Sequence, residues 1–164
     1  MRDSDLLISR CENAYSVKVN GRANFEYAVP LRNLAKSGDE ISRLDIDLAG
    51  CTAMDSTFMG VLTMLALKTR RNQVEMQLFN ASETLQKLLR DLGVIKLFSF
   101  KTGDPEAADA GERSGSATAL ETAETVSEAH KILVDANEEN RQKFSAVIDY
   151  AEADVERLRK AENK

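Results

Sequence analysis

Residues 44–60 read Leu-Asp-Ile-Asp-Leu-Ala-Gly-Cys-Thr-Ala-Met-Asp-Ser-Thr-Phe-Met-Gly, and this stretch decides the fold. Its first five residues alternate apolar and acidic side chains, which predicts a strand with one buried face. Asp55 and Ser56 are residue types that favour a helix N-cap, and an apolar run over residues 58–67 follows them. The alternation returns at residues 73–79. The stretch therefore predicts a strand, a helix and a second strand.

The N-terminus of this predicted helix is suited to an anion. The backbone N–H groups of a first turn have no partners within the helix and carry partial positive charge. A phosphate on Ser56 would add a charge of about −1.5 to −2 at that end. Asp-Ser at a loop-to-helix junction is also a common cap with no further chemistry. The local sequence leaves both interpretations open.

Residues 54–62 read Met-Asp-Ser-Thr-Phe-Met-Gly-Val-Leu, and together with the preceding strand they resemble the STAS domain of bacterial anti-sigma-factor antagonists. The resemblance covers roughly the first hundred residues. The usual motif of that family is Asp-Ser-Ser/Thr-Gly-Leu/Met-Gly. The resemblance implies that Ser56 accepts phosphate from a partner anti-sigma factor with serine kinase activity, and that a protein phosphatase removes it. The unphosphorylated form would then bind the anti-sigma factor and release the sigma factor.

Phe58 departs from the family motif, because it stands where the family has glycine. We expect its ring to project from the helix end and either to gate a partner or to anchor the interface. Arg22 and Asn24, in the loop after the second predicted strand, are expected at the same rim, although each also reads as an ordinary loop residue, with Asn24 as a cap. The expected partner-binding residues are Arg22, Asn24, Asp55, Thr57, Phe58 and Met59.

The remaining patterns over residues 1–101 predict an α/β fold, a STAS-like mixed β-sheet covered by helices mainly on one face. Two short strands form an antiparallel hairpin, and Asn20-Gly21 is expected to close the second. A helix is expected to begin at or just before Pro30, because proline suits a first turn. A later helix takes Asn80 or Ser82 as its cap, and residues 97–100 form a final edge strand.

The C-terminal part of the chain changes in composition. Residues 102–117 are rich in small and acidic residues, and we expect a flexible linker. Residues 118–164 carry apolar residues at helical spacing, which predicts a helical hairpin or bent helix with a break near residues 135–137. The apolar stripes need to be buried on each other, on the sheet or on a second protomer. A homodimer through the C-terminal helices therefore stays open.

Composition limits the function classes. The 164 residues carry a net charge of −5, which argues against a nucleic-acid or anionic-membrane surface. No segment is apolar enough to span a membrane and the first residues lack a signal-peptide pattern, so we expect a cytoplasmic protein with no membrane partner. Cys11 and Cys51 lack any metal or redox spacing, and we expect buried, reduced thiols.

No catalytic, cofactor or metal motif is present, so we expect neither an enzyme nor a bound cofactor. The only histidine, His130, lies beyond the predicted linker from Ser56. The leading hypothesis is an anti-sigma-factor antagonist, a binding module switched by reversible phosphorylation of Ser56. The alternative is a non-switching STAS-like scaffold or accessory subunit of a signalling or transport assembly.

Overall fold

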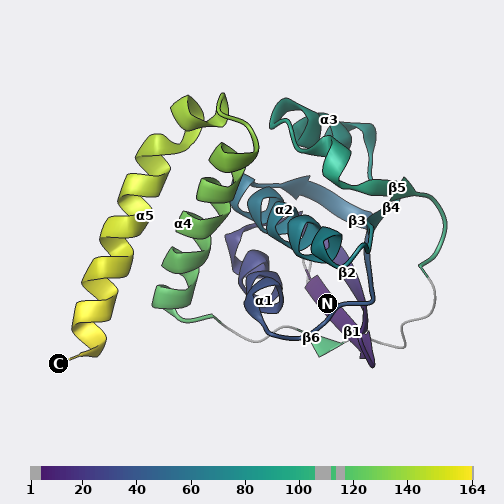
Figure 1. Ribbon diagram of the computed structural model, residues 1–164, viewed down its shortest axis with the longest axis horizontal. Coiled ribbons are helices and arrows are strands. Elements are labelled where there is room, and N and C mark those ends of the chain that lie inside the picture. Colours follow the sequence, from purple (N-terminus) through teal and green to yellow (C-terminus); the bar gives the residue numbers. More distant parts are fainter. Residues whose placement is uncertain (1–4, 106–111, 114–116, 164) are drawn as a thin grey trace.

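The computed structural model describes residues 5–105, 112–113 and 117–163 of the chain. Helices and strands follow one another in an order that begins with a β-hairpin and ends with two helices (Figure 1). Their bounds are β1 Asp5–Cys11, β2 Ala14–Ala23, α1 Phe25–Lys36, β3 Arg43–Met54, α2 Ser56–Arg71, β4 Met76–Phe79, α3 Glu83–Asp91, the 3-10 turn η1 Ile95–Leu97, β5 Ser99–Lys101, β6 Glu112–Arg113, α4 Ala119–Ala136 and α5 Asn140–Glu162.

The six strands form one mixed sheet in the order β5-β4-β3-β2-β1-β6. Strands β2, β3, β4 and β5 run parallel, whereas β1 is antiparallel to both of its neighbours. In the centre, Ile46 of β3 lies opposite Val17 of β2 and Leu78 of β4, and all three side chains are fully buried. The predicted hairpin and the strand at residues 44–48 are confirmed.

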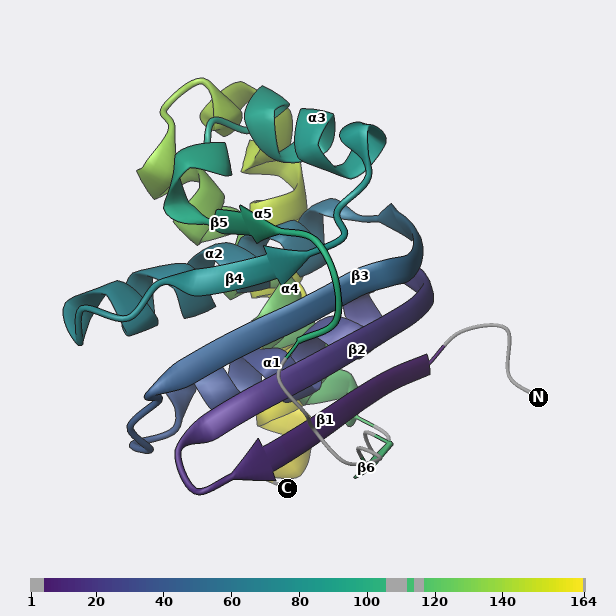
Figure 2. The same ribbon diagram turned by 90° about the vertical axis from the view of Figure 1, so that its right-hand side faces the viewer.

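The helices lie mainly on one face of the sheet. In Figure 2 the sheet lies in front, and α1, α2 and α4 lie behind it. Helix α4 packs against α1 and α2, and α5 packs against α4. On the other face of the sheet, Lys18 is exposed and Asp47 and Gln77 are partly exposed. This arrangement confirms the predicted class, a mixed sheet covered mainly on one side.

Helix α1 begins earlier than its proline predicts. Asn24 caps it by accepting a hydrogen bond from the Glu26 amide at 3.0 Å, and Pro30 lies inside the helix. Pro30 has no backbone N–H to donate. The carbonyl of Glu26, four residues earlier, therefore receives no helical hydrogen bond. Because Glu26 is exposed, water can satisfy that carbonyl. The expected start at Pro30 is therefore wrong.

Strand β2 also runs further than expected. Its pairing with β3 shifts register between Lys18 and Asn20 and again between Gly21 and Arg22, and the strand continues to Ala23. Gly21 has a φ of 80°, so the left-handed residue forms a bulge inside the strand instead of closing it. The last parallel strand begins at Ser99, because Leu97 ends the 3-10 turn η1. Of the two expected caps of α3, Ser82 is the one used.

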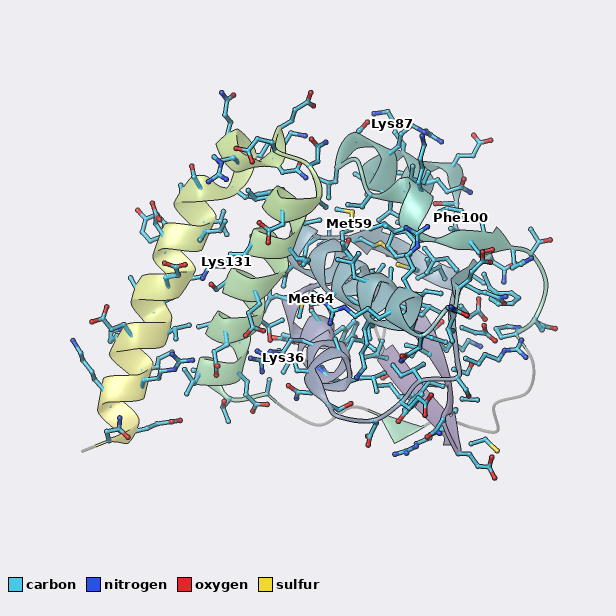
Figure 3. All side chains as sticks on the ribbon, viewed as in Figure 1. Lys36, Met59, Met64, Lys87, Phe100 and Lys131 are labelled. Carbon is cyan, nitrogen blue, oxygen red and sulfur yellow. The ribbon has the colours of Figure 1, made fainter. Side chains whose placement is uncertain are left out.

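The C-terminal residues form the predicted hairpin. Helix α4 ends at Ala136 and α5 begins at Asn140, which confirms the expected break. Two ion pairs join the helices, Lys131 with Glu152 at 2.5 Å and Arg159 with Glu124 at 3.1 Å; Figure 3 shows Lys131 between them. None of the helices in the described part of the chain has the length and apolar character needed to cross a membrane.

The expected linker contains one ordered pairing. Residues 112–113 form β6, and Arg113 pairs with Leu7 of β1. Residues 106–111 and 114–116 lie outside the described residues, so the flexibility expected of them stays a prediction.

Both cysteines are free thiols, but only Cys51 is buried as expected. Cys11 is exposed, because it lies at the end of strand β1 near the edge of the sheet.

Candidate functional site

Ser56 lies at the junction between β3 and α2. Asp55 has an extended backbone and its carboxylate accepts a hydrogen bond from the Phe58 amide at 2.8 Å, which starts the helix. Ser56 is the first residue of α2 and is partly exposed. The cap predicted from the sequence is thus present, and it places the Ser56 hydroxyl at the positive end of a 16-residue helix.

The ends of β2 and β3 bring the predicted rim residues to Asp55. Ala23 pairs with Met54, and the Asp55 amide donates to the Ala23 carbonyl at 3.0 Å. Arg22 and Asn24 flank this contact, because parallel strands end at the same edge of a sheet. A groove of about 280 Å³ lies here, lined by Arg22, Ala23, Asn24, Ala53, Met54 and Asp55.

His130 of α4 meets the Ser56 hydroxyl. The distance between Ser56 Oγ and His130 Nε2 is 2.7 Å, and His130 Nδ1 lies 2.7 Å from the carbonyl oxygen of Val126. A carbonyl oxygen only accepts, so Nδ1 carries the proton of the neutral ring and Nε2 is the acceptor. Ser56 Oγ therefore donates its proton toward Nε2. The two residues are 74 positions apart in the sequence.

A glycine lets α4 approach the face of α2 that carries Ser56. Gly60 lies four residues after Ser56 and therefore on the same helix face. A Cβ atom at Gly60 would lie 2.3 Å from the carbonyl oxygen of Ala129 and 2.7 Å from the Ala129 Cβ. Only glycine fits at that distance. The Gly60–Ala129 contact and the Ser56–His130 hydrogen bond belong to one seam between α2 and α4.

Ion pairs hold α4 against α1. Arg32 donates to both carboxylate oxygens of Glu128, from Nε at 2.7 Å and from Nη2 at 3.0 Å, and its Nη2 also lies 3.4 Å from Glu124. Lys36 Nζ reaches Glu128 at 2.6 Å, and Figure 3 shows Lys36 on the side of α1 that faces α4. Arg32 is buried although it is charged, which its bidentate pairing explains.

The imidazole of His130 is almost completely buried, with 2% of the residue exposed. The ring of Phe144 from α5 contacts it edge to face at a centroid distance of 4.8 Å. Burial lowers the pKa of His130, against the Val126 carbonyl and the nearby Asp55 carboxylate, which raise it. Burial also raises the pKa of Asp55, against the Phe58 amide, which lowers it. Near neutral pH the imidazole is therefore uncharged and ready to accept a proton.

The expectation that the Phe58 ring projects from the helix end is wrong, because Phe58 is fully buried. It lies two residues before Gly60, about 200° away around a helix of 3.6 residues per turn. It therefore faces away from α4 and joins the buried core with Leu62 and Leu65. Met59 and Thr57 are each only 5% exposed. None of these three side chains offers a contact surface to a partner in this conformation.

Sequence reasoning missed the role of His130, which it set apart from Ser56. The apolar stripe of α4 contained the signal, because Val126, Ala129 and Leu133 recur at helical spacing beside His130. Gly60 was a second signal in the sequence, because a glycine inside a long apolar helix permits close packing of another helix. In the part of the chain that the structure describes, no group of three or more histidine, cysteine and acidic side chains is arranged to hold a metal ion.

The chain belongs to the STAS domain family, whose sequence profile matches residues 11–109, more than half of the chain. The family resemblance seen in the Asp-Ser-Thr motif is thereby confirmed. No curated protein sequence matches the chain.

Three solved structures are similar to part of this chain at low sequence identity. The anti-sigma factor antagonist SpoIIAA in its unphosphorylated form is 12% identical, with a TM-score of 0.49, over 62% of this chain and 90% of that one. A putative anti-sigma factor antagonist from Thermotoga maritima is 15% identical, with a TM-score of 0.48, over 62% and 87%. An uncharacterised protein of the DUF3478 family with a SpoIIAA-like fold, from Shewanella loihica PV-4, is 18% identical, with a TM-score of 0.40, over 65% and 90%.

Proposed function

We propose that this protein is an anti-sigma-factor antagonist, a protein-binding module switched by reversible phosphorylation of Ser56. The partners would be an anti-sigma factor with serine kinase activity and a protein phosphatase. The observation that carries the proposal is the position of Ser56 in a member of the STAS family. It is the first residue of α2, directly after the Asp55 cap, and the residue is partly exposed.

The partner surface in this proposal is the rim around Ser56. Arg22 is exposed, Asn24 and Asp55 are partly exposed, and all three line the groove at the ends of β2 and β3. Phe58, Met59 and Thr57 then act through packing, because they are buried. A phosphate on Ser56 would put a dianion at the edge of this rim, and repulsion and desolvation would weaken a fitted interface.

Phosphorylation also changes the contact between Ser56 and α4. The phosphorylated Oγ has no proton to donate, and the neutral His130 Nε2 that faces it is itself an acceptor. Two acceptors at 2.7 Å repel each other unless the imidazole takes up a proton. The phosphate therefore either charges His130 or displaces α4. In both cases phosphorylation of Ser56 changes the charge or the position of the C-terminal hairpin.

A specific observation favours a second candidate, a non-switching scaffold or accessory subunit. Helix α4 covers the face of α2 that carries Ser56, and Ser56 Oγ is already hydrogen-bonded to His130. If α4 remains in place permanently, a kinase reaches the hydroxyl only with difficulty.

Binding measurements with the anti-sigma factor of the same cell separate the two candidates. Under the switch proposal Ser56→Asp abolishes binding and Ser56→Ala binds but is never phosphorylated. Under the scaffold proposal neither substitution changes binding. Comparable folding of both variants, checked by circular dichroism, is the control.

A homodimer through the C-terminal helices also remains a proposal. The apolar stripe of α4 is covered within the chain, whereas Tyr150 of α5 is 79% exposed and Val147 is 36% exposed. Sedimentation of the full chain beside Tyr150→Glu tests it, with a loss of mass to that of the monomer as the supporting result.

A further inference from the structure

Ser56 has a hydroxyl that can act as a nucleophile, and it is hydrogen-bonded to His130, a side chain that can act as a base. A serine is activated when a base lies within hydrogen-bond reach and a third group orients that base. Here Ser56 Oγ lies 2.7 Å from His130 Nε2, and the Val126 carbonyl holds Nδ1 at 2.7 Å. The base comes from the C-terminal hairpin, outside the matched STAS residues 11–109.

We propose that Ser56 and His130 form a nucleophilic dyad, in which His130 accepts the Oγ proton when Ser56 is phosphorylated. His130 is then a catalytic residue that the acceptor protein itself contributes. This inference rests on the proposed phosphorylation of Ser56, but the chemistry of the dyad is testable without any kinase.

The step balances with ATP as the phosphoryl donor. Ser56 Oγ forms a bond to the γ-phosphorus as the bond from that phosphorus to the β,γ-bridging oxygen breaks, and ADP leaves with the bond's electron pair. The Oγ proton passes to His130 Nε2. The resulting imidazolium faces the new phosphate, and the ion pair between them stabilises the product.

The geometry fixes the base. The tautomer is set by the Val126 carbonyl, and the ring is confined by Phe144 and by the close packing of α4 on Gly60. The imidazole does not have to move to receive the proton. Burial, which lowers the pKa of His130, keeps Nε2 unprotonated near neutral pH.

Helices α1, α2 and α5 pack against α4, the helix that carries His130. Asp55, at the start of α2, is the carboxylate that acts on the imidazole. On α1 the facing cations Arg32 and Lys36 are paired with Glu128, and Arg32 also with Glu124. On α5, Phe144 presents an uncharged ring, and Glu152 pairs with Lys131 of α4. A pH profile of Ser56 reactivity therefore reports on His130, with Asp55 as its electrostatic neighbour.

The test is the reaction of the full chain with a small alkyl fluorophosphonate. Ser56 Oγ attacks phosphorus, fluoride leaves, and the Oγ proton passes to His130. The expected result is an adduct located by mass spectrometry on Ser56. The rate falls at low pH with the midpoint at which NMR shows the single histidine ring to titrate. Ser56→Ala is the control for the position of the adduct.

The variant His130→Gln separates proton transfer from packing, because a glutamine amide oxygen accepts a hydrogen bond but takes no proton at these pH values. General-base assistance contributes about 100-fold or more, so labelling should slow by about that factor. If His130→Gln does not fold, the wild-type pH profile alone decides: a rate that ignores the histidine midpoint contradicts the dyad.

Three further results would overturn the proposal. They are no adduct on Ser56 between pH 5 and 9, equal rates for wild type and folded His130→Gln, or labelling only after α4 is loosened by Gly60→Ala. The last would mean that α4 blocks Ser56. Labelling of Ser56 without phosphorylation by any kinase retains the dyad and removes the proposed function. Phosphorylation of Ser56 at equal rates in wild type and His130→Gln retains the proposed function and removes the dyad.

Discussion

Ser56 Oγ and His130 Nε2 lie 2.7 Å apart, although a 74-residue separation and the 102–117 segment divide them in the sequence. The contact joins the residue that identifies the STAS motif to a helical hairpin beyond the matched family residues. The close packing of α4 on α2 at Gly60 and Ala129 brings the two residues to this distance. The hairpin is therefore part of the candidate site.

Gly60→Ala should destabilise the protein even though alanine is the better helix former. The added Cβ meets the Ala129 carbonyl oxygen at 2.3 Å, so α4 has to shift. We expect a loss of about 1–3 kcal/mol in the free energy of unfolding, as for other overpacked sites. Gly38→Ala is the matched control, because a Cβ at Gly38 meets nothing within 4 Å. Urea denaturation of both variants checks this, and an unchanged Gly60→Ala protein would disprove the close approach.

Phe58→Ala should cost about 3–5 kcal/mol, the range for a large buried side chain that leaves a cavity. Phe58 is fully buried, whereas Phe25, at the start of α1, is 43% exposed. The control Phe25→Ala should change stability by less than about 0.5 kcal/mol. Thermal unfolding of the two variants compares them directly. Equal effects would mean that Phe58 lies at the surface after all.

Arg32→Ala should loosen α4 from α1. It removes a bidentate pair with Glu128 and leaves that carboxylate with Lys36 alone, so we expect a loss of about 1.5–3 kcal/mol. Arg159 also pairs with Glu124, but its side chain is 60% exposed. Arg159→Ala should therefore cost less than about 1 kcal/mol. The denaturant midpoints of the two variants measure these losses. A larger loss of stability in Arg159→Ala than in Arg32→Ala would contradict the role given to Arg32.

The lone histidine should make stability depend on pH in one direction. Burial lowers the pKa of His130 in the folded state, so between that pKa and the ordinary value of about 6.5 the unfolded chain binds more protons. Stability from this group is complete above about pH 6.5 and is lost as pH falls toward the folded pKa.

Asp55 contributes with the opposite sign, because burial raises its pKa and the folded state then binds the extra proton as pH falls. The difference between wild type and His130→Gln, measured by thermal unfolding from pH 5 to 8, isolates the histidine. A wild-type protein whose histidine titrates above pH 6.5 by NMR would contradict the buried imidazole.

The sequence was sufficient for the sheet and its helices because local patterns there agree with the tertiary structure. The alternation at residues 44–48 and the Asp55 cap both act within a few residues. The prediction from the proline of α1 was wrong because Pro30 removes only one helical hydrogen bond, and Glu26, whose carbonyl loses its partner, is an exposed residue. Tertiary context overrode the local rule there.

The site was only half predictable for the same reason. Ser56, Asp55 and the nearby rim residues Arg22 and Asn24 follow from the order of strands and the family motif. The burial of Phe58 depends on which side of α2 faces the sheet, and the contact with His130 depends on where the hairpin docks. Both are long-range properties that residue spacing along the chain does not contain.

The division into a domain of residues 1–101 and a separate tail stays a prediction. The docking of α4 on α1 and α2 weighs against the independence of the tail.

The central claim is that Ser56 is the phosphorylated switch. The most direct measurement incubates the full chain with Mg²⁺-ATP and the anti-sigma serine kinase of the same cell, and then locates phosphate by mass spectrometry of peptides. We predict one phosphate, on Ser56, and none in Ser56→Ala. Phosphate on another residue, or on none with any such kinase, would contradict the switch and leave the non-switching scaffold as the function of this STAS protein.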